Sequence, residues 1–149
     1  MLLTYLDLVE LVADGVLAPV APSQINAASI DVRLGNRLLI EDPERAARID
    51  LAKREVPPFV GAPLCADGCW LLHPGEFCLA HTREVFDLPA DVCAEFKLKS
   101  SLARAGLGHA LSGFCDPGWT GSVLTLGLRN DLQYNCPSVA RGSVGSRWS

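Results

Sequence analysis

Residues 124–130 have the sequence LTLGLRN, in which leucine returns at every second position. This period of two is typical of a β-strand that buries one face. Thr125, Gly127 and Arg129 then occupy the other face. A glycine inside a strand contributes no packing, and it commonly marks a bulge or the close approach of a ligand. The segment therefore predicts a strand whose second face is open at position 127.

Similar alternation predicts further short strands before this one. Apolar residues alternate over 30–34 and over 92–98, and Gly35–Asn36 is a predicted turn. Residues 69–82 predict a hairpin, with two strands separated by a turn at Pro74–Gly75. Many short strands with turns between them are typical of an all-β barrel or a jelly-roll-like sandwich. The chain is therefore predicted to be mainly β.

One helix is predicted, at the N-terminus. Thr4 and Asp7 have the spacing of a capping box, and Gly15 is a typical helix stop. The apolar face of this helix is predicted to carry Leu6, Val9 and Val12. Residues 41–63 are first charged and then rich in proline, which predicts an irregular arm. The strands, helix and arm are predicted to form one domain, residues 1–135.

Composition limits the classes of function. The chain has 149 residues and a net charge of −4, and 49% of its residues are hydrophobic. A negative net charge disfavours binding along the phosphate backbone of a nucleic acid. No apolar run approaches the roughly 18 residues of a membrane span, and acidic residues near the N-terminus are atypical of a signal peptide. The sequence therefore predicts a globular, cytoplasmic protein that binds neither nucleic acid nor membrane.

Cysteine usage offers two interpretations. Free, mostly buried thiols are the simpler one for a cytosolic protein of this size. Cys65, Cys69 and His73 have a C-x3-C-x3-H spacing that suits a metal, but the sequence offers no clear fourth ligand. Free thiols are therefore favoured over zinc, and no metal ligand is assigned to the side chains. The six cysteines are Cys65, Cys69, Cys78, Cys93, Cys115 and Cys136.

The densest polar cluster lies in residues 97–106, KLKSSLARAG. Two cations and two hydroxyls are predicted to lie where a strand ends and a short helical turn begins: Lys99, Ser100, Ser101 and Arg104. Such a turn, with its backbone N–H groups, suits a phosphate or polyphosphate. The alternative is a capped helix, in which Ser100 or Ser101 is the N-cap and both cations are solvated. Sequence pattern alone leaves both interpretations open.

A second cluster lies in residues 113–122, GFCDPGWTGS. Its Asp-Pro-Gly sequence is first of all a turn. A fixed carboxylate such as that of Asp116 can accept a hydrogen bond from a sugar hydroxyl, and Trp119 can pack against a ring. The third element is the face of strand 123–130 that carries Thr125. These three elements are the candidates for chemistry.

The clusters resemble the dCTP deaminase branch of the dUTPase-like trimeric nucleotide enzymes. Four segments carry the resemblance, in the family's order: INAASIDVRLGN (25–36), LHPGEFCLAHTREVFDLPADV (72–92), LKSSLARAGL (98–107) and GFCDPGW (113–119). The similarity extends from about residue 3 to residue 135. The dUTPase branch normally has Ser-Gly-Leu-Ala where this chain has Ser-Ser-Leu-Ala-Arg, which favours the deaminase branch.

The resemblance implies a dUTPase-like distorted barrel, or β-clip, with a short N-terminal helix. It also implies a homotrimer whose three active sites are shared between neighbouring subunits. The implied reaction is the hydrolytic removal of the 4-amino group of dCTP, giving dUTP and ammonia in pyrimidine deoxynucleotide biosynthesis. Mg²⁺ accompanies the triphosphate, and the family does not use a catalytic zinc.

Residue roles follow from the same resemblance. Ser100 and Arg104 would position the attacking water and polarise the base, with position 127 as the third catalytic position. Asp116 would bind the 3′-hydroxyl of the deoxyribose, and Trp119 would pack against the sugar and exclude ribose. The backbone of residues 125–126 would contact the cytosine edge. The implied substrate-binding residues are Lys99, Ser100, Ser101, Leu102, Ala103, Arg104, Asp116, Trp119, Thr125, Leu126 and Gly127.

Gly127 departs from the family, which places a glutamate there as the base that carries a proton from water to the departing nitrogen. Three interpretations remain open: an inactivated variant that still binds nucleotide, a member whose base lies elsewhere, and a non-catalytic binding or regulatory protein. Glu95 is expected to project with Lys97 away from the pocket, and His109 is expected in a surface loop. A dUTPase is the least favoured alternative.

Residues 136–149 are a second departure. The family usually continues with another strand and a segment that closes over the triphosphate, whereas this chain has CPSVARGSVGSRWS. The sequence lacks alternation and contains several helix and strand breakers, which predicts a disordered tail. Loss of a barrel strand would expose a sheet edge.

Overall fold

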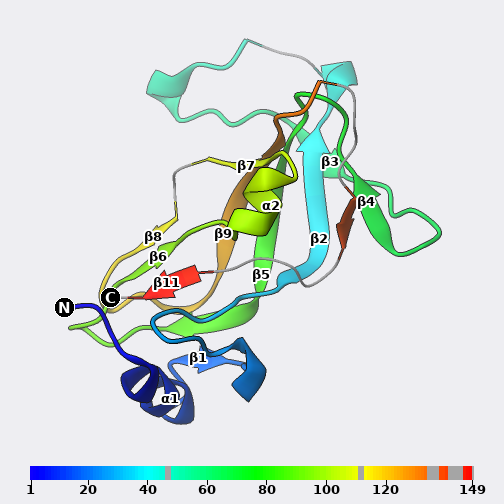
Figure 1. Ribbon diagram of the computed structural model, residues 1–149. Helices are drawn as coiled ribbons and strands as arrows, with labels where there is room; N and C mark the ends of the chain where they lie inside the picture. The colour runs from blue at the N-terminus through cyan, green and yellow to red at the C-terminus, as the bar shows by residue number, and fades with distance from the viewer. Residues whose placement is uncertain (46–47, 111–112, 134–137, 141–145, 149) are drawn as a thin grey trace.

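The structure is a computed structural model that describes residues 1–45, 48–110, 113–133, 138–140 and 146–148. It is mainly β, as predicted (Figure 1). The strands are β1 (Leu17–Ala18), β2 (Leu34–Glu41), β3 (Phe59–Gly61), β4 (Cys69–Leu71), β5 (Phe77–Asp87), β6 (Ala94–Phe96), β7 (Leu107–His109), β8 (Phe114–Cys115), β9 (Thr120–Asn130), β10 (Ser138–Ala140) and β11 (Ser146–Trp148). The helices are α1 (Tyr5–Ala13), α2 (Ser100–Arg104) and the 3-10 turns η1 (Pro22–Gln24), η2 (Pro43–Arg45) and η3 (Leu51–Lys53).

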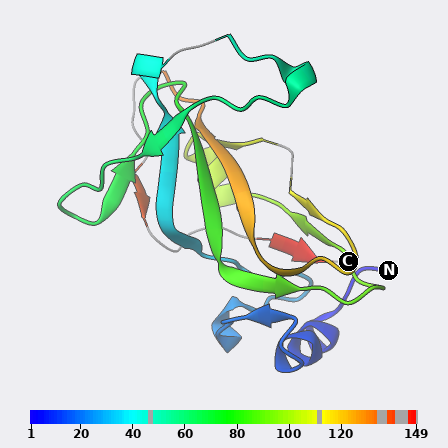
Figure 2. The same ribbon diagram turned by 180° about the vertical axis from the view of Figure 1, so that it is seen from behind.

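The main sheet has the order β3-β2-β5-β9-β7, and β1 pairs with one end of β5. The long strands β2, β5 and β9 curve side by side through the centre of the molecule (Figures 1 and 2). Two smaller sheets, β10-β4 and β11-β6-β8, complete the described structure. The arm between β2 and β3 projects at the end of the sheet opposite α1, as Figure 2 shows.

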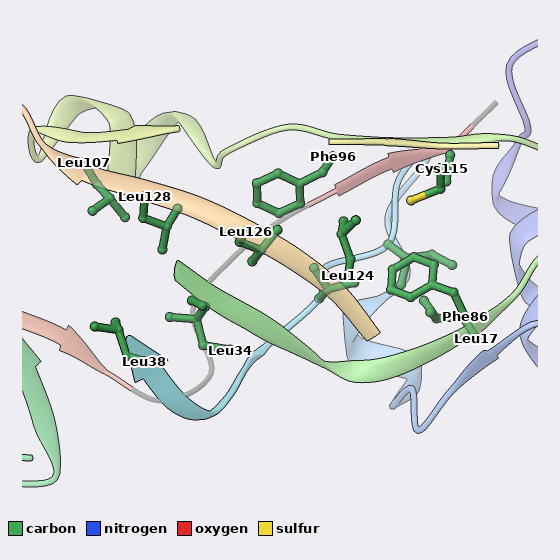
Figure 3. Close-up of a cluster of buried hydrophobic side chains, with 14 of the residues drawn as sticks. Leu17, Leu34, Leu38, Phe86, Phe96, Leu107, Cys115, Leu124, Leu126 and Leu128 are labelled. Atoms are coloured by element: carbon green, nitrogen blue, oxygen red, sulfur yellow. The ribbon is translucent and has the colours of Figure 1, made fainter. Parts of the chain in front are cut away.

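Strand β9 confirms the alternation predicted for residues 124–130. Leu124, Leu126 and Leu128 are buried, while Thr125 and Arg129 are exposed. Figure 3 shows the three leucines in one apolar cluster with side chains from β2, β5, β6 and β7. The buried face of β9 thus helps to form the core, and its other face lies outside that cluster.

Helix α1 begins as predicted but buries a different face. Thr4 and Asp7 form the capping box, and Gly15 follows the helix with a φ of +79°. Leu8 and Leu11 are the buried residues, however, and Leu6 is 75% exposed. The predicted face was wrong because apolar residues occupy most positions of this helix, so helical spacing alone fits more than one face.

Strand β2 corrects the turn predicted at Gly35–Asn36. The strand continues through these residues, and its register with β5 shifts between the Leu34–Thr82 and Leu38–Ala80 pairs. Two more residues of β2 than of β5 lie between those pairs, which is a bulge-like irregularity. Glycine fits there because a Cβ at Gly35 would stand only 1.9 Å from Cε1 of His81. The glycine therefore accommodates a side chain rather than a chain reversal.

Three further segments differ from the predicted pattern. Residues 69–82 contain two strands and a turn, but β4 pairs with β10 while β5 lies between β2 and β9, so they form no hairpin. Residues 30–33 are not a strand, although Ile30 and Val32 are buried as predicted. Short strands β10 and β11 occur at 138–140 and 146–148, inside the tail predicted to be disordered. Partners distant in sequence explain these differences, since local patterns do not specify them.

Candidate functional site

The segment predicted to bind phosphate follows β6 and forms the short helix α2. Lys99 is its N-cap residue, and no side-chain hydrogen bond caps the helix. The interpretation of Ser100 or Ser101 as a capping serine is therefore wrong. Both serines are exposed, as is Arg104, so their polar groups are accessible to a ligand. Figure 1 shows α2 beside β7 and the last part of β9.

Lys99 is held by a carboxylate that the sequence did not single out. Its Nζ forms an ion pair with Asp31, which corrects the expectation of a solvated cation. The backbone carbonyl of Asp31 accepts a hydrogen bond from Nε2 of Gln24 at 2.6 Å. Gln24 in turn lies 3.2 Å from Oε1 of the fully buried Glu84. A chain of polar contacts thus connects the core to the phosphate-binding candidate.

Asp116 and Trp119 lie at the other end of β9. The turn between β8 and β9 contains Gly118 with a φ of +78°, a backbone conformation that favours glycine. Asp116 is exposed, and the Trp119 ring packs on Phe86 with centroids 5.6 Å apart. Leu88 donates a backbone hydrogen bond to the Trp119 carbonyl at 2.9 Å. The turn therefore presents a carboxylate beside a partly covered, fixed aromatic ring.

The middle of β9 has an incompletely paired edge. Strand β7 pairs with β9 only from Leu128 to Asn130, and Ala110 adds one hydrogen bond to the Gly127 carbonyl at 2.9 Å. On that side, no strand in the described part of the chain pairs with Thr125 or Leu126. The backbone N–H and C=O of Thr125 point to that side, because Gly127, two residues on, accepts its hydrogen bond from Ala110 there, whereas the backbone groups of Leu126 point to β5.

Gly127 is buried although it has no side chain. A Cβ at this position would lie 3.0 Å from the Ala110 Cβ and 3.1 to 3.3 Å from ring atoms of Phe77. These distances are tighter than ordinary van der Waals contact, so a side chain needs its neighbours to shift by a few tenths of an ångström. Position 127 is therefore narrow rather than open space.

A cavity of about 590 Å³ lies on the face of the sheet that carries Thr125. Its lining combines apolar groups such as Leu79 and Val123 with polar ones, namely Thr125, His81 and Arg37. An adjoining cavity of about 490 Å³ shares Asn36, His81 and Val123 with it. An apolar hollow with a few polar groups is the usual form of a small-molecule site.

One chain does not bring the three candidate clusters together. Lys99 to Arg104 lie near the Asn130 end of β9, and Asp116 and Trp119 precede its first residue. The strand has 11 residues, which corresponds to a length of roughly 33 Å at the usual rise of a strand. The cavity beside Thr125 lies between these ends and is lined by β2, β5 and β9.

His109 and Glu95 are the two alternative titratable groups. Glu95 forms an exposed ion pair with Lys97, as expected. His109 is the last residue of β7 rather than part of a loop, and its ring meets Phe96 edge-on with centroids 4.6 Å apart. It is paired in register with Leu128, a core residue, so its side chain lies on the face of the sheet opposite Thr125. Neither group reaches the cavity.

The surroundings of His109 predict a pH effect on stability. Burial, and then the charge of Lys97, lower the pKa of His109 from its ordinary value of 6.5. The unfolded chain therefore binds more protons than the folded chain as the pH falls below about 6.5, and the free energy of unfolding decreases there. We expect His109→Phe, which keeps an aromatic ring, to lose less stability than the wild-type chain between pH 7.5 and 5.5 in urea titrations. Equal losses of stability in the two proteins would contradict the attribution of this pH dependence to His109.

No group of three or more His, Cys, Asp or Glu side chains is placed to hold a metal ion within the described ranges. Cys65 and Cys69 do lie across a tight turn, where the Cys65 N–H donates to the Cys69 carbonyl at 2.8 Å. Burial raises the pKa of the Cys78 thiol to about 12 and that of Cys115 to about 11, so both are unreactive. Cys136 lies outside the described residues.

No described helix is long and apolar enough to cross a bilayer.

Asp31, Gln24, Glu84 and His81 are the residues that sequence reasoning missed. Asp31 occurs in the segment 25–36, but nothing local indicates its ion pair with a residue 68 positions away. Glu84 occupies a core-facing position of β5, between Thr82 and Phe86. The sequence did contain a signal for Glu84: a charged residue at a position that alternates with buried residues needs a partner in the core.

Comparison with solved structures defines the fold class first. The crystal structure of 2′-deoxycytidine 5′-triphosphate deaminase from Agrobacterium tumefaciens superposes with a TM-score of 0.72. The match covers 98% of this chain and 47% of that one at 24% identity. It supports the predicted dUTPase-like β fold.

Sequence comparison then identifies the family: this chain belongs to the dCTP deaminase-like family, whose profile matches residues 2–135. It is 42% identical over 113 residues to a protein of Streptomyces griseus named "dCTP deaminase, dUMP-forming", covering 75% of this chain and 59% of that relative. A Nocardia farcinica protein of the same name is 40% identical over 139 residues, with coverages of 87% and 66%. The chain thus spans about three-fifths to two-thirds of the length of these relatives.

Proposed function

We propose that this protein binds dCTP and catalyses its hydrolytic deamination. The cavity beside Thr125 carries this proposal, because it combines apolar walls with a few polar side chains, namely those of Thr125, His81 and Arg37. A pyrimidine ring presents flat apolar faces and a hydrogen-bonding edge, which such a place can accommodate. Membership of the dCTP deaminase-like family supports this choice of ligand.

The triphosphate is proposed to bind at α2. The side chains of Ser100, Ser101 and Arg104 are exposed and no serine is used as a cap, so they can donate hydrogen bonds to phosphate oxygens. Lys99 would exchange its ion pair with Asp31 for a phosphate. Mg²⁺ would arrive on the triphosphate, where it neutralises charge between phosphates. Leu102 and Ala103, the remaining residues of α2, would form the apolar part of this contact.

Sugar recognition is proposed to come from a neighbouring copy of the chain. Asp116 and Trp119 lie just before the start of β9, whereas α2 lies near its other end. A single nucleotide therefore cannot contact both ends of one subunit. In a cyclic trimer the interfaces are heterologous, so unlike surfaces of neighbouring copies meet at each one. We therefore propose a homotrimer with three shared sites, in which the partner copy contributes the Asp116 turn.

The reaction requires two proton transfers. Water forms a bond from its oxygen to C4 of cytosine, while one of its protons passes to N3. The second proton then passes from the C4 hydroxyl to the amino nitrogen, the C4–N4 bond breaks, and ammonia leaves as C4 becomes a carbonyl. Ser100 and Arg104 are proposed to orient the water and the base. A group that carries both protons is still required.

A direct assay tests the proposal. Purified chain is incubated with dCTP and Mg²⁺, and dUTP, dUMP and ammonia are followed separately. We expect ammonia in equal amount to the uridine nucleotide formed. Accumulation of dUMP would extend the activity to phosphate hydrolysis, which the names of the relatives indicate for them. CTP in place of dCTP serves as the control, and its equal turnover would contradict the proposed role of Trp119.

The narrow space at Gly127 favours a second candidate, a nucleotide-binding protein without turnover. Phe77 and Ala110 occupy the neighbourhood in which the family's glutamate is expected. Calorimetric titration with dCTP, combined with the absence of ammonia release, would establish this alternative. Absence of both binding and turnover would contradict the two candidates together.

Free thiols support a cytosolic location for either candidate, because such thiols persist in a reducing compartment. The free cysteines in the described ranges are Cys65, Cys69, Cys78, Cys93 and Cys115.

A further inference from the structure

His81 is the histidine on the cavity face of strand β5. It is paired in register with Thr125, and the next pair along this face is Leu79 with Gly127. Paired residues of antiparallel strands have Cα atoms roughly 5 Å apart and side chains on the same face. His81 is half-buried and lines both adjoining cavities. It therefore borders the space proposed for the cytosine.

Hydrogen bonding fixes which ring nitrogen of His81 can act as a base. Nδ1 lies 2.7 Å from the backbone carbonyl of Thr82, and a carbonyl can only accept. The proton of the neutral imidazole therefore resides on Nδ1. Nε2 then carries the lone pair, and no described residue donates a hydrogen bond to it. A base oriented by a second contact is the usual arrangement for proton transfer.

Gly35 holds the ring in this place. The three His81 atoms nearest to an ideal Cβ on Gly35 are Cε1, Nδ1 and Nε2, at 1.9 to 2.5 Å. The imidazole therefore occupies the space that any other residue at position 35 would fill. This contact holds the ring on the β2 side of the cavity, and Thr125 lines the same cavity from β9.

We propose that Nε2 of His81 is the proton carrier of this chain, in place of a carboxylate at position 127. This inference rests on the proposed function. Nε2 takes a proton from water as the oxygen bonds to C4, and the imidazolium delivers it to N3. Nε2 then takes the proton of the C4 hydroxyl and delivers it to the amino nitrogen, so that ammonia leaves and the imidazole returns to its neutral form. No oxidant or further reactant is needed.

The other candidates for this role are excluded by position. Glu95 is paired with Lys97 on β6, and His109 faces Phe96 on the opposite side of the sheet. The Glu84 carboxylate is fully buried and bound by Arg33. Asp31 is paired with Lys99. Of the described histidines and carboxylates, His81 alone borders both cavities.

Five proteins form the test: the wild type, His81→Gln, His81→Ala, Gly127→Glu and the double variant of His81→Gln with Gly127→Glu. General acid–base catalysis contributes 10²–10⁴-fold, so we expect His81→Gln to lower the kcat for dCTP deamination by about 10²-fold or more. Its KM should change by less than about threefold, since a proton carrier acts in the transition state. In the Gly127→Glu background, His81→Gln should have little effect, because the carboxylate then carries the proton. Added imidazole should partly restore turnover to His81→Ala.

Two results would overturn the inference. Wild-type turnover retained by His81→Gln would remove His81 from the reaction and leave dCTP deamination standing. An equal loss from His81→Gln in both backgrounds, without imidazole rescue of His81→Ala, would show that the residue supports only the structure. Absence of wild-type deamination would instead contradict the proposed function, and the inference with it.

Discussion

In the His81→Gln background, Gly127→Glu is expected to raise the kcat for dCTP deamination by about 10²-fold, within the range that a positioned acid–base group supplies. The new carboxylate would extend from β9 on the Thr125 face, beside the cavity of about 590 Å³. The dCTP deaminase branch, which this chain resembles, has a glutamate at the corresponding position. The ammonia-release assay at saturating dCTP measures the change.

The same substitution is expected to reduce stability. Its Cβ would meet the Ala110 Cβ at 3.0 Å and the Phe77 ring at 3.1 Å, so both neighbours must shift. Overpacking of this kind costs about 1–3 kcal/mol, which a urea titration detects. Gly127→Gln is the matched control, since it adds nearly the same volume without a basic carboxylate. An equal increase of kcat in the glutamine variant would contradict proton transfer by the glutamate.

The local sequence pattern was sufficient to predict those elements that depend only on residues close in the chain. The alternating leucines of β9 and the capping box of α1 follow from residues within a few positions of each other. The choice of buried face on α1 depends on which side meets the rest of the core. Leu8 and Leu11 are selected by that contact, and no local signal distinguishes them from Leu6.

Long-range partners account for what the sequence did not predict. Gly35–Asn36 has the composition of a turn, yet His81 of β5 lies against Gly35 and the strand continues. The role of Lys99 as a cation was predicted, but its partner Asp31 is distant in sequence. At position 127 the sequence indicated a missing carboxylate, while only the structure shows the narrow space between Ala110 and Phe77. Substrate roles at α2 and at Asp116 stay predictions until a nucleotide complex tests them.

Glu84→Ala is expected to lower the free energy of unfolding by about 1–3 kcal/mol, the usual effect of removing an acceptor from buried or partly buried donors, since the Arg33 side chain is 29% exposed. Glu84 is fully buried and accepts hydrogen bonds from the Arg33 backbone N–H at 2.8 Å and from Arg33 Nε at 2.9 Å. Both donors lose their partner in the variant, and Gln24 loses a contact at 3.2 Å. A buried donor left without an acceptor is more costly than the net gain from the bond that held it.

The matched control is Glu95→Ala, which removes an exposed ion pair with Lys97 and should change stability by no more than about 1 kcal/mol. Guanidinium or urea titrations at neutral pH compare the two variants. Because Gln24 also holds the Asp31 carbonyl at 2.6 Å, and Asp31 pairs with Lys99, Glu84→Ala should weaken dCTP binding as well. Equal, small losses of stability in both variants would mean that Arg33 finds another acceptor. The contact with Glu84 would then not be what positions the phosphate-binding segment.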